Sequence, residues 1–138
     1  MTSGEWDRAW DDRRFDQASA ADVLARWMLR PGGADAVFVA FRDVPGVSFE
    51  LSTPGRRFRK AKPAILRIGE WLFVVPPGVT GEIDVVHEVR GVVLQTRRTD
   101  AATSAGHLAE LVLGAAKRFG PDADMAVQSA LFGLAAVR

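Results

Sequence analysis

The chain has 138 residues, 48% of them hydrophobic and 25% charged, which fits one globular domain over residues 1–138 and excludes an intrinsically disordered chain. The formal net charge of +1 leaves no general attraction to polyanions, so nucleic-acid binding would require a local basic patch. No cysteine is present, and this excludes disulfides, thiol catalysis and thiolate metal sites.

The start of the chain is charged and lacks the apolar core of a secretory signal peptide. No apolar run reaches the roughly 18 residues that a membrane-spanning helix needs. We therefore expect a cytoplasmic protein. Basic residues are mostly arginine and alanine is abundant, which favours a bacterial source with a GC-rich genome.

Residues 1–18 combine acidic and aromatic side chains. Trp6 and Trp10 would share one face of a helix, because residues four positions apart lie one turn above each other. One interpretation is a short helix that fixes its tryptophans to the domain. The other is a mobile arm that binds a partner or is exchanged between two copies.

Ser19 predicts the N-cap of a helix that continues to about Leu29. The helix should end before Pro31, because the residue preceding a proline avoids the helical region. Its apolar residues form a single stripe, which we interpret as core: Val23, Leu24, Trp27 and Met28.

A β-hairpin is predicted next. Residues 36–41 form an apolar run, residues 47–51 alternate between apolar and polar, and Pro45-Gly46 between them favours a tight turn. The residues of the second strand expected to face the core are Val47, Phe49 and Leu51.

The segment 56–62 is the most unusual local feature, because it carries five basic residues and no acid. It can be a solvated loop or an edge strand whose charges prevent strand pairing. It can instead bind a phosphate, a nucleic acid or an acidic partner, with one aromatic ring for stacking. The residues concerned are Arg56, Arg57, Phe58, Arg59, Lys60 and Lys62.

The remaining strands are predicted at residues 64–67, 71–75, 82–90 and 92–98. Their β-branched content favours strand over helix. In the third of them every second residue is apolar or histidine, which indicates one drier face: Ile83, Val85, His87 and Val89.

Two helices are predicted at the C-terminus. The first is capped by Thr99 or Asp100, with Ser104 as a second candidate, and the last runs from Asp122 to about Val137. The last helix is apolar almost all round, so it must be buried on more than one side. We expect a second copy to supply part of that burial, with the interface at Met125, Leu131, Phe132 and Leu134.

No recognisable catalytic set accompanies the two histidines. On a strand, His87 and Asp84 point to opposite faces, so we interpret His87 as an ordinary sheet residue and His107 as a solvent-exposed helix residue. We expect no catalytic or metal-binding residues and no cofactor. Five aromatic residues can line either a core or a pocket, and core is the simpler interpretation: Trp27, Phe49, Trp71, Phe73 and Phe119.

The sequence therefore predicts a two-layer α+β fold, with an antiparallel sheet of about five strands between residues 36 and 98 and the N-terminal helix and two C-terminal helices packed on one face. For function it favours a small non-enzymatic interaction or adaptor protein that forms a homodimer. Two alternatives stay open. One is binding of nucleic acid, a phosphate ligand or an acidic partner through residues 56–62. The other is a carrier or enzyme with an apolar pocket between sheet and helices, on which His87, Arg67 or Arg97 would converge.

Overall fold

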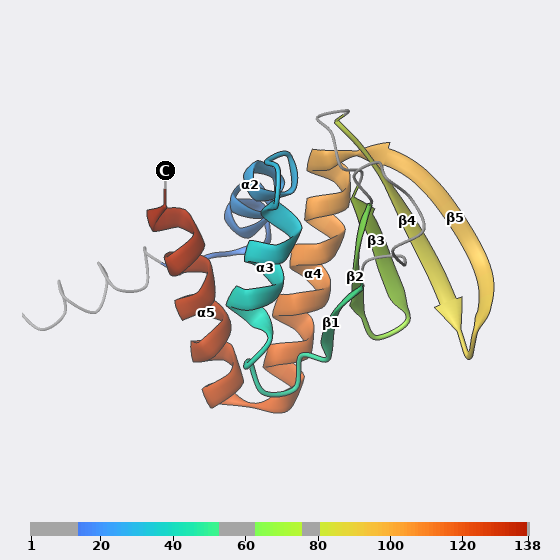
Figure 1. The fold of residues 1–138 in the computed structure, drawn as a ribbon. Helices are drawn as coiled ribbons and strands as arrows, with labels where there is room; N and C mark the ends of the chain where they lie inside the picture. The colour runs from blue at the N-terminus through green and yellow to red at the C-terminus, as the bar shows by residue number, and fades with distance from the viewer. Residues whose placement is uncertain (1–13, 53–62, 76–80, 138) are drawn as a thin grey trace, which may run out of the picture.

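The computed structural model describes residues 14–52, 63–75 and 81–137. It has an α+β fold of four helices and one five-stranded antiparallel sheet, which confirms the predicted class (Figure 1). The helices are α2 (Gln17–Met28), α3 (Gly33–Phe41), α4 (Ala101–Phe119) and α5 (Pro121–Ala136). The strands are β1 (Phe49–Ser52), β2 (Ala64–Ile68), β3 (Trp71–Val75), β4 (Glu82–Val89) and β5 (Val92–Asp100).

The sheet is a meander in which each strand pairs with the next one along the chain, in the order β1-β2-β3-β4-β5. All four helices lie on one side of it (Figure 1). α4 contacts β4 and β5, and α3 contacts β1 and β2. α2 and α5 pack mainly on α3 and α4. The sheet extends beyond its helical cover at the β5 edge, which lies farthest from α5.

The predicted hairpin between residues 36 and 51 is wrong, because residues 36–41 belong to helix α3. Val37 and Phe41 are both fully buried while Val39 is exposed, which is the one-sided burial of a helix. A short apolar run does not distinguish a helix from a buried strand by periodicity. The second half of the prediction holds: Val47 and Phe49 are buried, and residues 49–52 form β1.

The N-cap of the first helix is Asp16 and not Ser19, so the predicted helix start is corrected by three residues. The Ser19 backbone N–H donates to Asp16 Oδ1 at 2.8 Å, and the Asp16 backbone N–H donates to Ser19 Oγ at 3.0 Å. This reciprocal pair is a capping box. At α4 the prediction of Asp100 is confirmed, because its carboxylate accepts from the Thr103 backbone N–H at 2.6 Å.

The core lies between the helices and the helix-facing side of the sheet. Leu66 and Phe73 pair in register across β2 and β3, and Phe73 pairs with Val85 on β4. Directly paired residues lie on the same face of a sheet, so these three form one buried row. α3 is fixed to this layer by Phe41, whose ring stacks on Phe49 with centroids 5.9 Å apart. Phe49 and Phe73 are therefore core residues, as the simpler interpretation held, but that interpretation is wrong for Phe119, which is 64% exposed.

Among the helices that the structure describes, none combines the length and apolarity required to cross a membrane.

Candidate functional site

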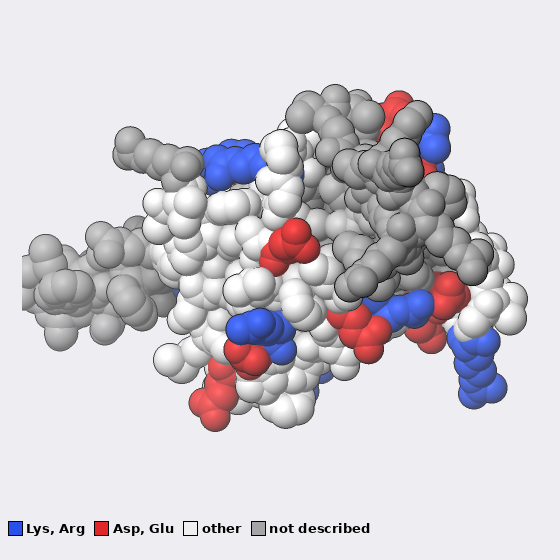
Figure 2. Space-filling view, viewed as in Figure 1, with Lys and Arg blue, Asp and Glu red and all other residues white. Residues whose placement is uncertain are grey.

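The basic segment 56–62 lies outside the described residues, so its proposed role stays a prediction. On the face shown in Figure 2, acidic and basic side chains of the described residues are interspersed and not gathered by sign. That distribution matches the small net charge.

The four residues predicted for a dimer interface on α5 divide into two pairs. Leu131 and Leu134 are buried in the core of the chain itself. Met125 and Phe132 remain 66% and 41% exposed on the opposite side of the helix. Many apolar side chains of α5 are thus buried by the chain's own helices. The surface left for a partner is the stripe that contains Met125 and Phe132.

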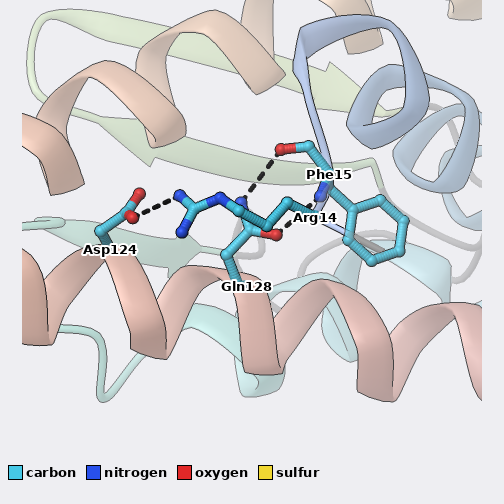
Figure 3. A network of polar contacts seen from close by, with 4 residues as sticks. All are labelled: Arg14, Phe15, Asp124 and Gln128. Atoms are coloured by element: carbon cyan, nitrogen blue, oxygen red, sulfur yellow. Dashed lines mark hydrogen bonds and ion pairs between the residues drawn. The ribbon is translucent and has the colours of Figure 1, made fainter. Parts of the chain in front are cut away.

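The start of the described chain is fixed to α5 (Figure 3). The Phe15 backbone N–H donates to Gln128 Oε1 at 2.7 Å, and Gln128 Nε2 donates to the Phe15 carbonyl at 3.0 Å. Arg14 forms an ion pair with Asp124, and the Phe15 ring meets Phe132 edge-on with centroids 4.8 Å apart. Of the segment 1–18, residues 14–18 therefore belong to the folded domain, while residues 1–13 lie outside the described part.

β5 is a long edge strand. Among the described residues it pairs with β4 alone, and every residue from Val92 to Arg98 is exposed. Three consecutive large apolar residues open the strand, and Val92, Val93 and Leu94 are 59%, 55% and 60% exposed. A free row of backbone donors and acceptors beside exposed apolar side chains is a surface on which another strand can pair.

A half-open cavity of about 280 Å³ lies between the helix-facing side of the sheet and the first turns of α4. The strands contribute Trp71, Val85, Gln95, Arg97 and Thr99. The helix contributes Thr103, Ser104 and His107. Strand pairing explains why these strand residues lie together: Val85 pairs with Arg97, and His87 pairs with both Trp71 and Gln95. All these residues share the face that α4 partly covers.

His107 is half-buried and not the freely exposed helix residue that the sequence indicated. Its ring meets Trp71 edge-on with centroids 4.4 Å apart and Phe73 with centroids 5.6 Å apart. It therefore fills the space between the helix and the aromatic residues of β3.

His87 is a sheet residue, as predicted, with a partner that the sequence did not indicate. Its ring stacks on Trp71 with centroids 4.3 Å apart, and its Nε2 lies 3.0 Å from Glu70 Oε2. Asp84 points to the other face, where it accepts from Arg98 Nε at 3.0 Å.

Two neighbouring arginines of β5 have opposite surroundings. Arg98 is paired with Asp84 on the face away from the helices. Arg97 lines the cavity and forms no ion pair with any carboxylate that the structure describes. Arg67 also points away from the helices, where Nη2 donates to Glu88 Oε1 at 2.7 Å. Arg97 is thus the one arginine among the lining residues of the cavity.

Trp71 and Arg97 were named from the sequence for a possible pocket, but other lining residues were missed. Gln95, Arg97 and Thr99 are polar residues at every second position of β5, and Thr103 and His107 stand one helical turn apart on α4. Polar residues repeated on the side of a strand that faces the helices indicate a polar cavity and not a packed core. Among the described residues no cluster of histidine and acidic side chains has the arrangement needed to hold a metal ion.

Burial lowers the pKa of His107 below its ordinary value; Glu110 opposes this effect and Arg97 adds to it. The unfolded chain therefore takes up the His107 proton at a higher pH than the folded chain. The stability that neutral His107 contributes is fully present above the ordinary pKa of roughly 6.5 and is lost as the pH falls below it.

We expect the free energy of unfolding of the wild type to fall more than that of His107→Gln between about pH 7.5 and about pH 5.5. Urea unfolding at the two pH values measures this difference. His87 is present in both proteins, so its contribution cancels. Equal losses in the two proteins would contradict the partial burial of the His107 ring.

No curated protein matches this chain, and no solved structure does. One family matches residues 12–136, which cover all of the described helices and strands. The chain belongs to that family, which is described as a domain of unknown function, DUF5073.

Proposed function

We propose that this chain is a small non-enzymatic interaction protein that self-associates by pairing the free edge of β5 with β5 of a second copy. The observation that carries the proposal is the continuous exposure of β5 from Val92 to Arg98, together with its three exposed apolar residues. Proteins that remain monomeric usually blunt such an edge by shortening it, covering it, or placing charged residues or a proline on it. β5 has nine residues and no proline, and its two arginines lie beyond the three exposed apolar residues that open it.

The charges of β5 are compatible with self-pairing. In an antiparallel pair centred on Thr96, Gln95 of one copy lies opposite Arg97 of the other, and Leu94 lies opposite Arg98. No two arginines then face each other directly, whereas a pair centred on Arg97 would place like charges opposite and be destabilised. The pairing would join two five-stranded sheets into one continuous sheet.

The test is the molar mass from light scattering at micromolar concentration. We expect a dimer for the wild type and a dimer dissociation constant raised roughly tenfold or more for Leu94→Lys, because the new cation adds to Arg97 and Arg98 across the pair. Met125→Glu is the matched control, since it places a charge at an exposed apolar position on α5.

Three results would contradict the β5 interface. A wild type that is monomeric throughout would exclude self-association. Dissociation by Met125→Glu or Phe132→Glu, with Leu94→Lys still dimeric, would move the interface to α5. A monomeric wild type that binds an unrelated extended peptide along β5 would identify a different protein as the partner.

A further inference from the structure

We infer that the cavity between β4, β5 and α4 is a binding site for a small carboxylate that carries a flat apolar group, with Arg97 as the anion-binding residue and Trp71 as the apolar wall. The site does not depend on self-association, because its lining comes from one copy of the chain.

The cavity has the size and lining of a site for a small molecule. Its volume of about 280 Å³ is enough for a molecule of one ring and one short polar group. Buried Val85 and half-buried Trp71 supply apolar surface, and a few polar groups surround it. Small-molecule sites typically combine an apolar wall with a small number of placed polar side chains.

The charge of the ligand follows from Arg97. Its guanidinium is the single formal charge among the lining residues, and no carboxylate of the described residues pairs with it. A guanidinium presents parallel N–H donors that match the two oxygens of a carboxylate. Arg98, one residue along, already has Asp84 as its partner on the other face, so the two side chains are not equivalent.

The shape of the ligand follows from Trp71. Its ring is held from two sides, since His87 stacks on it at an interplanar angle of 12° and His107 meets it edge-on. The part of this ring that lines the cavity is therefore a rigid apolar surface for a flat group, because it loses little freedom when a ligand packs on it. His107 and the Thr99 and Thr103 hydroxyls lie around the same cavity and can donate hydrogen bonds to an anion.

The experiment is a titration of the full chain with benzoate, followed by NMR of the His107 ring and the Trp71 indole and by calorimetry. We expect saturable shifts of both side chains. Arg97→Gln should weaken benzoate binding about tenfold or more, because it removes the charged donor. Arg98→Gln is the matched control and should leave binding unchanged. Trp71→Phe keeps a ring at the wall and should weaken binding less than Arg97→Gln.

Neutral benzamide and the small anions acetate and inorganic phosphate complete the test. We expect each of them to bind at least about tenfold more weakly than benzoate, since benzamide lacks the charge and the anions lack the ring. No saturable shift with benzoate would overturn the proposal, and so would equal losses in the two arginine variants. Acetate or phosphate binding as tight as benzoate would overturn the role of Trp71. The Leu94→Lys variant should bind benzoate as the wild type does, so this site and the β5 interface can fail independently.

Discussion

Replacing Gly33 with alanine is expected to lower the free energy of unfolding by at least about 3 kcal/mol, a large share of the stability of a typical small domain. A Cβ atom at this position would lie 1.6 Å from the Trp27 carbonyl oxygen and 2.6 Å from the Trp27 carbonyl carbon. Both are backbone atoms of the last turn of α2, so no side-chain rotation relieves the contact. The tight junction between α2 and α3 therefore requires glycine here.

The backbone of Trp27 cannot easily move away, because its Nε1 donates to the Leu134 carbonyl at 2.9 Å. This hydrogen bond links the end of α2 to the end of α5. Urea unfolding followed by circular dichroism measures the loss. Gly133→Ala is the matched control: its Cβ meets nothing within 4 Å, and it lies inside α5. Alanine there should raise the free energy of unfolding by about 0.5–1 kcal/mol. A Gly33→Ala protein as stable as the wild type would contradict the α2–α3 junction.

The sheet was predictable where side chains alternate. β4 follows the period-two pattern of residues 82–90, with a register shift against β5 between His87 and Glu88. β5 is exposed along almost its whole length and does not alternate. The pattern failed at residues 36–41, where all six residues are apolar and the choice between helix and strand depends on what packs against them. Phe41 stacks on Phe49 of β1, and this tertiary contact is not visible in the local sequence.

The candidate site was only partly predictable. The sequence placed His87 on the drier face of β4, but Glu70, its polar partner, belongs to the turn before β3 and becomes a neighbour only through strand pairing. The same applies to Arg97 and His107, which lie on different elements and line the same cavity between α4 and the sheet. A sequence shows which residues share an element's face, whereas the distance between two elements depends on packing.

The last prediction concerns α5, where the interface expected from the sequence divides into buried and exposed positions. Leu131→Ala should lower the free energy of unfolding by about 2–5 kcal/mol, because Leu131 is only 1% exposed and its removal leaves a cavity in the core. Met125→Ala should change it by less than about 0.5 kcal/mol, because most of that side chain is in solvent. Urea unfolding of both variants measures the contrast.

The dependence of these values on protein concentration identifies the role of each residue. A residue that stabilises the single chain has the same effect at every concentration, whereas a residue in a dimer interface has a larger effect as the dimer becomes populated. We expect a constant loss for Leu131→Ala between about 1 and about 100 µM, and a negligible loss for Met125→Ala throughout. A loss for Met125→Ala that grows with concentration would show that the exposed stripe of α5, and not β5, holds two copies together.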